Sequence, residues 1–264
     1  MRPLFTRPLF TRLLFTRPLL MRPLFQIILL LSLSFQFSGC GIDSTDEIAA
    51  IGDSVTWGYG GLPGGWVSRL ERASGYKISN LAIPGETADD GAKRAKAAFL
   101  TVPRASKIII LHGGNNWVRT FRRSPCSSKC QPEDVADTYA NVVMNQKLIR
   151  DIAHQMGKKT VFATYWASAL AACDSFYDAE QFALYQKHLD YMNANTVKLA
   201  EALGDPIVRL DDIGDISKSA THYYDCLHPN ETGYNIIAAR WLRDIDVWKP
   251  SQQSHFAKRD LLSF

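Results

Sequence analysis

The stretch IAAIGDSVTWG, residues 48–58, decides the fold class of this chain. Its first five residues are apolar or glycine, which is typical of a strand buried on both faces of a parallel sheet. Ser54 follows the Gly-Asp turn at the end of this strand. Ligands of open parallel sheets bind beyond the carboxyl ends of the strands, so Ser54 lies where a nucleophile can be displayed. Taken alone, a serine at such a place is more often a helix N-cap.

Outward from this stretch, apolar runs and helical patterns alternate along the chain. Further strands are predicted at 76–82, 107–112, 160–165 and 206–210, and helices at 66–74, 87–100, 133–155, 179–202 and 230–242. Parallel strands need right-handed crossovers, which place helices on both faces of the sheet. We therefore expect a single α/β domain over residues 48–248, built as a three-layer α/β/α sandwich around a five-stranded parallel sheet. A polar tail follows at 249–264.

The first 39 residues form a leader that is distinct from this domain. Residues 2–26 repeat a pentad (RPLFT, RPLFT, RLLFT, RPLLM, RPLFQ), a period that fits neither a helix nor a strand. From Met21 onward, one arginine, an apolar run of about ten residues and then small residues follow the layout of a secretory signal peptide. The run is too short to span a bilayer. We expect translation to start at Met21 and the upstream pentads to be duplicated or misassigned coding sequence.

The segment FSGC at residues 37–40 resembles the lipobox of bacterial lipoproteins, although Phe37 replaces the usual leucine. In such signals the cysteine becomes the lipidated first residue, so Cys40 is expected to be a membrane anchor and residues 40–47 a tether. The alternative is an ordinary signal peptide with a chance cysteine. By the same resemblance, Gly41 favours the outer membrane over the inner one. The sequence thus predicts an exported lipoprotein that faces the periplasm or the cell surface.

The basic character of the full chain comes from this leader. The sequence holds 30 lysines and arginines against 26 aspartates and glutamates, a formal net charge of +4. Five of the arginines and none of the acidic residues precede Cys40, which leaves 25 basic against 26 acidic residues after it. A net charge of −1 gives no reason to expect nucleic acid or another polyanion as a partner.

Four cysteines follow Cys40 in the sequence. An even number of cysteines in an exported chain suggests two disulfides, whose pairing cannot be deduced from the sequence alone. Cys126 and Cys130 lie in a loop rich in serine and lysine and can close a short ring. We expect that pair, which leaves Cys173 to bond with Cys226.

The segment DCLHPN, residues 225–230, allows two interpretations. Asp225 could orient the imidazole of His228, or these two residues could hold a metal together with Cys226 and His222. A structural zinc site needs four ligands, usually in spaced pairs, and these four lie too close together to surround one ion easily. A cysteine in an exported chain is also usually oxidised. We therefore expect no metal at this segment.

Four motifs at the predicted strand ends and in the last loop together resemble those of the SGNH, or GDSL, hydrolase superfamily. They are GDS at 52–54, NLAIPGET at 80–87 with its Gly85, GGNN at 113–116 with its Asn115, and DCLHPN at 225–230. Each motif alone is weak, but they occur in the order of the family's blocks I, II, III and V. Asn116 departs from the aspartate that is usual there, at a position outside the catalytic set. The resemblance implies a flavodoxin-like fold and a cofactor-independent serine hydrolase.

The resemblance also implies roles for individual residues. Ser54 is expected to be the nucleophile, His228 the base that takes its proton, and Asp225 the carboxylate that fixes the imidazole. The donors of the oxyanion hole are expected to be the backbone N–H groups of Ser54 and Gly85 and the side chain of Asn115.

The function that follows is an extracytoplasmic serine esterase, or lipase, that cleaves short- or medium-chain esters, lysophospholipids or aryl esters. A carbohydrate O-deacetylase of the same superfamily is the alternative, since aromatic side chains near the strand ends could line a sugar pocket. These aromatic residues are Trp57, Tyr59, Trp117, Tyr165 and Trp166, and a place in the core is at least as good an interpretation of each. A non-catalytic lipoprotein that binds glycan or lipid is a more distant alternative, which is disfavoured because no catalytic residue is missing.

Overall fold

The computed structural model describes residues 48–123 and 129–249 of the chain. Within this part, five strands form one sheet in the order β2-β1-β3-β4-β5, and every neighbouring pair is parallel. The strands are β1 (Ile48–Gly52), β2 (Ile78–Asn80), β3 (Lys107–Leu111), β4 (Lys159–Ala163) and β5 (Ile207–Val208). The five-stranded parallel sheet is confirmed, but β2 and β5 are shorter than predicted. The predicted leader, the tether and residues 250–264 of the tail lie outside the described residues.

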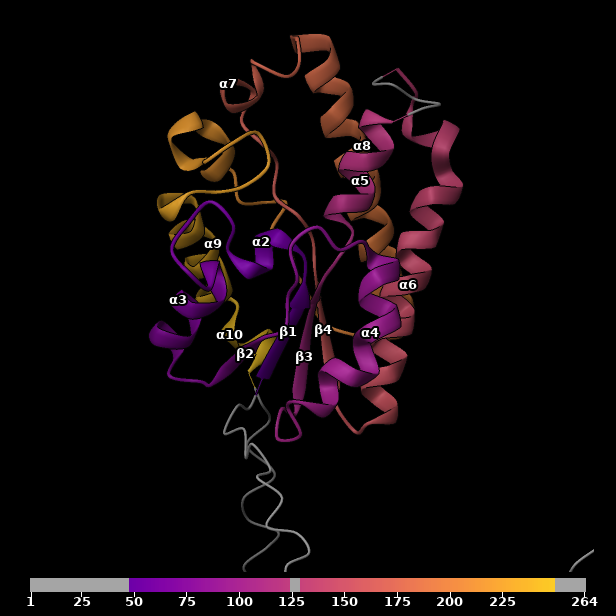
Figure 1. Ribbon diagram of the computed structural model, residues 1–264, viewed down its shortest axis with the longest axis vertical. Helices are drawn as coiled ribbons and strands as arrows, with labels where there is room; N and C mark the ends of the chain where they lie inside the picture. Colours follow the sequence, from indigo (N-terminus) through magenta and orange to yellow (C-terminus); the bar gives the residue numbers. More distant parts are fainter. Residues whose placement is uncertain (1–47, 124–128, 250–264) are drawn as a thin grey trace, which may run out of the picture. The chain divides into compact units, whose positions relative to one another are not determined.

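Helices cover both faces of the sheet, as predicted for a three-layer sandwich. They are α2 (Ser54–Trp57), α3 (Gly65–Ser74), α4 (Ala88–Leu100), α5 (Gly114–Arg122), α6 (Ala136–Gln155), α7 (Leu170–Cys173), α8 (Ala179–Leu203), α9 (Glu231–Arg243) and α10 (Ile245–Trp248), with 3-10 turns η1 (Pro132–Val135), η2 (Ile216–Lys218) and η3 (Ala220–His222). Helices α3 and α9 pack together on one face, and α4 and α6 pack together on the other (Figure 1). No helix in the described part is long and apolar enough to cross a membrane.

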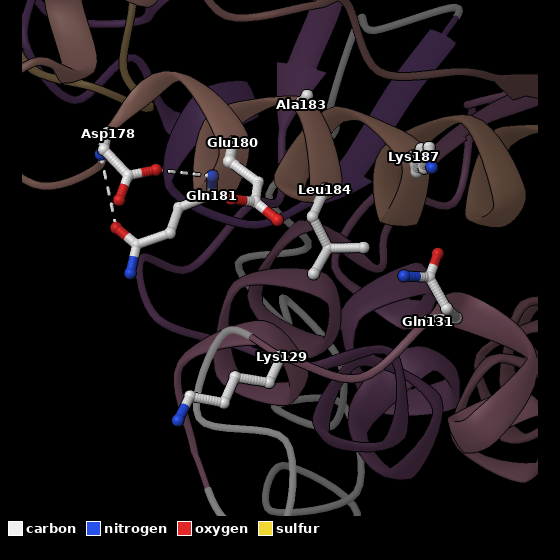
Figure 2. Close-up of a pocket in the computed structure, with 8 residues that line it drawn as sticks. All are labelled: Lys129, Gln131, Asp178, Glu180, Gln181, Ala183, Leu184 and Lys187. Atoms are coloured by element: carbon white, nitrogen blue, oxygen red, sulfur yellow. Dashed lines mark hydrogen bonds between the residues drawn. The ribbon is translucent and has the colours of Figure 1, made fainter.

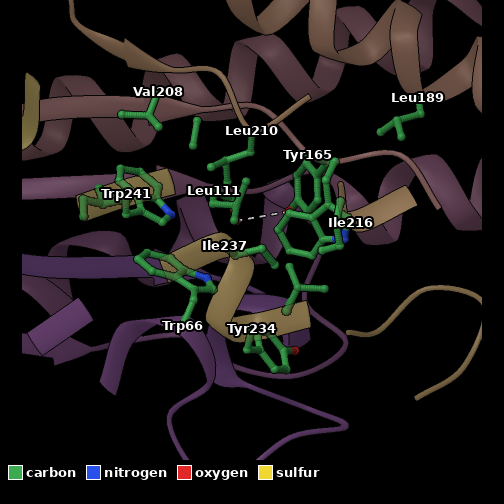
Figure 3. Close-up of a cluster of buried hydrophobic side chains, with 14 of the residues drawn as sticks. Trp66, Leu111, Tyr165, Leu189, Val208, Leu210, Ile216, Tyr234, Ile237 and Trp241 are labelled. Atoms are coloured by element: carbon green, nitrogen blue, oxygen red, sulfur yellow. Dashed lines mark hydrogen bonds between the residues drawn. The ribbon is translucent and has the colours of Figure 1, made fainter. Parts of the chain in front are cut away.

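The two faces of the sheet bury two separate apolar clusters because side chains alternate along each strand. Ile48 of β1 belongs to the same cluster as Trp66 of α3 and Trp241 of α9. The rings of the two tryptophans stack with their centroids 4.9 Å apart (Figure 3). Ala49, the neighbour of Ile48, points to the opposite face, where Phe99 of α4 lies. Burial on both faces explains why the central strands read as continuous apolar runs in the sequence.

The strand order places the site at the carboxyl ends of the two central strands β1 and β3. The chain leaves β1 for β2 on one side and then crosses over to β3 on the other, so the connections change direction between β1 and β3. Gly52 at the end of β1 pairs with Leu111 at the end of β3. The loops that leave these two strands therefore start at the same level, which is where doubly wound sheets bind their ligands.

Helix α5 was not predicted, because two successive glycines in GGNN are a strong turn signal. The structure has the turn at Gly113, whose φ of 126° lies in the region that favours glycine, and the helix starts at Gly114. The predicted helix at 133–155 is likewise divided, into the 3-10 turn η1 and then α6. The short helices α2, α7 and α10 also lack a signal in the sequence.

Candidate active site

Ser54 lies at the first position of α2, directly after β1. The N-cap of this helix is Asp53, whose Oδ1 accepts a hydrogen bond from the N–H of Val55 at 3.2 Å. The interpretation of Ser54 as an N-cap is therefore wrong. The Ser54 hydroxyl instead hydrogen-bonds to Nε2 of His228 at 2.9 Å, across 174 positions of sequence. This contact brings the predicted nucleophile and the predicted base together.

Asp225 holds the other side of the imidazole. Its Oδ2 lies 2.8 Å from Nδ1 of His228, and its Oδ1 accepts the backbone N–H groups of Leu227 and His228 at 2.8 and 2.7 Å. Although burial acts to raise the pKa of Asp225, these hydrogen bonds from His228 and Leu227 hold that pKa below its usual value. The group therefore stays an ionised carboxylate, which favours the Nδ1–H tautomer of the imidazole.

The loop that carries Asp225 and His228 is held by hydrogen bonds from the Asn230 side chain and by a backbone bridge. Asn230 is the N-cap of α9, and its side-chain amide also donates to the carbonyls of Thr221 and Tyr223. Tyr223 and Pro229 form an isolated antiparallel bridge across the loop. Helix capping and loop closure thus use the same asparagine, so the position of His228 is coupled to the start of α9.

A disulfide joins this loop to the end of α7. The structure contains the predicted bond between Cys173 and Cys226, and both residues are buried. Cys226 is therefore oxidised and cannot act as a thiolate ligand of a metal. No group of three or more potential ligand side chains that could hold a metal is found within residues 48–123 and 129–249. Of the predicted pair of Cys126 with Cys130, Cys126 lies outside the described residues.

The double variant Cys173→Ala/Cys226→Ala is expected to lose about 4 kcal/mol of unfolding free energy, since the bond closes a long loop in the unfolded chain. The sequence separation of the two cysteines is 53 residues. The value of kcat is expected to fall as well, because a displacement of about 1 Å at a catalytic group can cost on the order of 100-fold. Urea unfolding and ester hydrolysis of the variant and the wild type measure both effects. An unchanged urea midpoint would show that the bond does not constrain this loop.

The predicted donors of an oxyanion hole follow the carboxyl ends of three strands, with Ser54 at the start of α2, Gly85 in the loop after β2 and Asn115 near the start of α5. Asn115 is the second residue of α5, and its side-chain amide donates one proton to the carbonyl of Glu86 at 2.9 Å. The loop that carries Gly85 is held to the end of β1, because the N–H of Ile83 donates to the carbonyl of Gly52 at 3.1 Å. Asn115 therefore lies against the Gly85 loop, and the amide's second proton can serve another acceptor. That these groups stabilise an oxyanion stays a prediction.

Asn116 has a structural use at the neighbouring position. Its Oδ1 accepts the backbone N–H of Ala88, the first residue of α4, at 2.9 Å. The first turn of a helix has backbone donors without partners inside the helix, so this contact supports the start of α4. An asparagine can serve this role because its side-chain oxygen accepts the hydrogen bond.

Asp53 and Tyr165 form a buried pair next to Ser54 that was not predicted from the sequence. The hydroxyl of Tyr165 donates to Oδ2 of Asp53 at 2.7 Å. Burial raises the pKa of Asp53 to about 6, although the hydrogen bonds from Tyr165 and Val55 act to lower it. The preference of aspartate for helix N-caps is the signal that could have pointed to Asp53. The hydrogen bond from Tyr165 could not be predicted from local sequence, because the two residues lie 112 positions apart.

The aromatic residues that could line a pocket or belong to the core divide into two groups. Trp117, Tyr165 and Trp166 are buried in the core, so the core alternative holds for them. Trp57 and Tyr59 are exposed, and the Tyr59 ring lies beside that of His228. The suggested metal ligand His222 instead makes a hydrogen bond through Nδ1 with the carbonyl of Ile216.

A surface hollow of about 500 Å³ lies elsewhere, between the start of α8 and the segment before η1 (Figure 2). Its lining includes Lys129 and Lys187 as well as Asp178 and Glu180, so both signs of charge are present. Asp178 is already used as the N-cap of α8. The hollow contains none of the residues described above and offers no group suited to ester chemistry.

Comparison with known proteins gives one family and one fold. The model of the GDSL-like lipase/acylhydrolase family matches residues 50–236. A lipase/acylhydrolase from Enterococcus faecalis has a similar fold, with a TM-score of 0.56 and 19% identity over 79% of this chain and 100% of the other. The lipase Lip_vut3 from a goat rumen metagenome has a TM-score of 0.59 and 17% identity over 78% of this chain and 99% of the other. The psychrotrophic esterase EstA from Pseudoalteromonas sp. has a TM-score of 0.54 and 19% identity over 76% of this chain and 97% of the other. No curated protein matches the sequence significantly.

Proposed function

Because this chain belongs to the GDSL-like lipase/acylhydrolase family of ester hydrolases, we propose that it cleaves carboxylic esters through an acyl-enzyme intermediate on Ser54. In this proposal His228 transfers the protons and Asp225 orients the imidazole. The observation that carries it is the continuous hydrogen-bond chain from the Ser54 hydroxyl through both ring nitrogens to the carboxylate, at 2.9 and 2.8 Å. Such a chain lets a weak hydroxyl nucleophile lose its proton as it attacks.

Acylation begins when Oγ of Ser54 attacks the ester carbonyl carbon and its proton passes to Nε2 of His228. The carbonyl π bond opens onto oxygen and gives a tetrahedral oxyanion. This intermediate collapses as the bond to the alcohol oxygen breaks, and that oxygen takes the proton from Nε2. The alcohol leaves, and the acyl group stays on Ser54 as an ester. Asp225 remains ionised and stabilises the imidazolium that forms in between.

Deacylation repeats these steps with water as the nucleophile. His228 takes one proton from water, and the hydroxyl oxygen attacks the acyl carbon. Collapse of the second tetrahedral intermediate breaks the bond to Oγ of Ser54, which recovers its proton from Nε2. One ester and one water have then become one carboxylic acid and one alcohol, and the enzyme is unchanged.

A fluorophosphonate probe tests the nucleophile directly. The reaction forms a phosphorus–oxygen bond at the activated hydroxyl and releases fluoride. We expect mass mapping to find the adduct on the peptide that contains Ser54, and p-nitrophenyl acetate present during labelling to slow its formation. An adduct on another residue, or none, would contradict the proposal. Rates on p-nitrophenyl acetate and octanoate then compare short with medium acyl chains.

The variant Asn115→Ala is expected to lower kcat about 100- to 1,000-fold, the usual effect of removing one oxyanion donor. The KM should change far less, because the charge that Asn115 would stabilise develops only in the transition state. Initial rates on p-nitrophenyl acetate measure both constants. Asn145→Ala is the matched control, since Asn145 lies half-buried on α6 and its side-chain amide bonds to Asn141 of the same helix. If the two variants have the same kcat, Asn115 is not an oxyanion donor.

We further propose that the protein is exported and anchored through a lipid on Cys40. The lipobox-like segment supports this proposal, and so does the Cys173–Cys226 disulfide, because such bonds persist mainly in oxidising compartments. Expression of Cys40→Ser in a bacterium is expected to shift the protein from the membrane fraction to the aqueous fraction. Ser44→Ala, which leaves Cys40 in place, should stay with the membranes. Retention of Cys40→Ser in the membrane fraction would exclude this anchor.

A further inference from the structure

We infer that Tyr59 and Tyr224 form the subsite for the alcohol half of the ester, and that this alcohol carries a ring. The inference rests on the proposed function of the Ser54 site and adds a substrate class to it. It is independent of acyl chain length, because the alcohol and the acyl group leave the site separately.

The proposed mechanism fixes where the alcohol must lie. Nε2 of His228 gives its proton to the alcohol oxygen at the moment when the alcohol departs, so these two atoms must come within hydrogen-bond distance. The acyl carbon stays bonded to Oγ of Ser54 at the same time. A side chain that packs on the imidazole and is open to solvent is therefore placed beside the alcohol group of the substrate.

Tyr59 and Tyr224 meet this description. The ring of Tyr59 lies 4.6 Å from that of His228, and the ring of Tyr224 lies 5.8 Å from that of Tyr59 in an edge-to-face arrangement. Tyr59 is 43% exposed and Tyr224 is 62% exposed. Adjacent exposed aromatic rings at a catalytic histidine leave apolar surface uncovered that a ligand can bury.

The backbones of both tyrosines form hydrogen bonds with the backbones of Ser54 and His228. The N–H of Tyr59 donates to the carbonyl of Ser54 at 2.9 Å, and the N–H of Tyr224 donates to the carbonyl of His228 at 2.8 Å. Gly60 packs closely on Tyr224, because a Cβ at Gly60 would lie 2.7 Å from the Cβ of Tyr224. The two rings are thus attached to the reacting groups by short paths, which is how a preorganised subsite is built.

The shape of the pair selects a ring over a chain. Two rings at 82° to each other offer one face and one edge, which suits the offset or edge-to-face packing of a third flat ring. A phenyl ring and the C–H face of a sugar ring share this chemistry, whereas a linear alkyl chain presents no flat face. An aryl or benzyl alcohol and an acetylated sugar are the two sources that an experiment must separate.

Three acetates with the same acyl group provide the test: benzyl acetate, n-pentyl acetate and a peracetylated methyl glucoside. We expect kcat/KM for at least one of the ring-bearing acetates to exceed that for n-pentyl acetate by about 3- to 10-fold, the range typical of one aromatic contact. Tyr224→Ala is expected to bring this ratio close to one, and Tyr224→Phe, which keeps the ring, should preserve it. Leu148→Ala, at an exposed apolar position of α6, is the control for removal of a large side chain.

The outcomes show whether Tyr59 and Tyr224 bind the alcohol or only position His228. If Tyr59→Ala and Tyr224→Ala lower kcat/KM equally on all three acetates, the tyrosines only position His228 and the inference fails. The inference also fails if the wild-type kcat/KM of both ring-bearing acetates is no higher than that of n-pentyl acetate. Both of these results leave the proposed function intact. If the wild type hydrolyses none of the acetates in a Ser54-dependent manner, the proposed function fails, and the inference fails with it. Benzyl acetate as the better substrate points to aryl esters, and the glucoside points to acetylated sugars.

Discussion

Ser54→Ala is expected to lower kcat for ester hydrolysis by about 10⁶-fold, the order of loss seen when the nucleophile of a serine hydrolase is removed. The substitution deletes one oxygen, and that oxygen is the atom that attacks the ester in the proposed mechanism. The fold should be retained, because the helix is capped by Asp53 and not by Ser54. Any remaining rate would come from substrate binding and the oxyanion donors.

Purified protein and p-nitrophenyl acetate are sufficient for this measurement. Ser74→Ala is the matched control. Ser74 ends α3 just before β2, so it lies toward the amino-terminal ends of the strands, away from Ser54. Equal urea midpoints for the wild type and Ser54→Ala would exclude loss of the fold as the cause. If the wild type and Ser54→Ala hydrolyse the ester equally slowly, the protein is not an esterase of the proposed kind.

Asp225→Asn is expected to lower kcat by about 10⁴-fold, because the amide selects the wrong tautomer of the histidine. In the wild type, one carboxylate accepts two backbone N–H groups and the Nδ1–H of His228. An asparagine has a single acceptor oxygen, which the two backbone N–H groups would retain. Its NH₂ would then face Nδ1 and donate to it, so the ring proton would move to Nε2. With a proton on Nε2, His228 cannot accept the proton of Ser54.

The same p-nitrophenyl acetate assay measures this variant beside Asp215→Asn, whose carboxylate lies exposed near η2. We expect Asp215→Asn to keep the wild-type rate, since its ion pair with Lys218 is on the surface and contributes little. The KM of Asp225→Asn should stay close to that of the wild type, because tautomer choice affects proton transfer more than binding. A kcat within tenfold of the wild type would mean that Asp225 is not the orienting carboxylate.

The strands at the centre of the sheet could be predicted because their patterns have few alternatives. Three consecutive isoleucines at 108–110 fit a strand that is buried on both faces, and β3 is such a strand. The edge strands and the short helices were harder, because their lengths depend on tertiary contacts. GGNN shows the limit: the turn is at Gly113, but whether the chain continues as a loop or as α5 is decided by packing against α6 and α8.

At the candidate site, too, contacts between residues close in sequence could be predicted and contacts between distant residues could not. Asp225 and His228 can meet locally because they are three residues apart, whereas the approach of Ser54 to His228 over 174 positions was expected only from the family resemblance. Tyr224 gave no signal, because nothing in the segment THYYDCLHPN distinguishes an exposed tyrosine from a buried one. In the structure Tyr223 is buried and Tyr224 is exposed.

The shortness of the edge strands bears on how the chain behaves at high concentration. Strand β2 has three residues and β5 has two, whereas β1, β3 and β4 have five each. An exposed sheet edge is a template on which another molecule can add a strand, and short edge strands are one way in which native proteins prevent this. The most apolar strands are therefore shielded from intermolecular pairing, and aggregation through the sheet would first require β2 or β5 to detach.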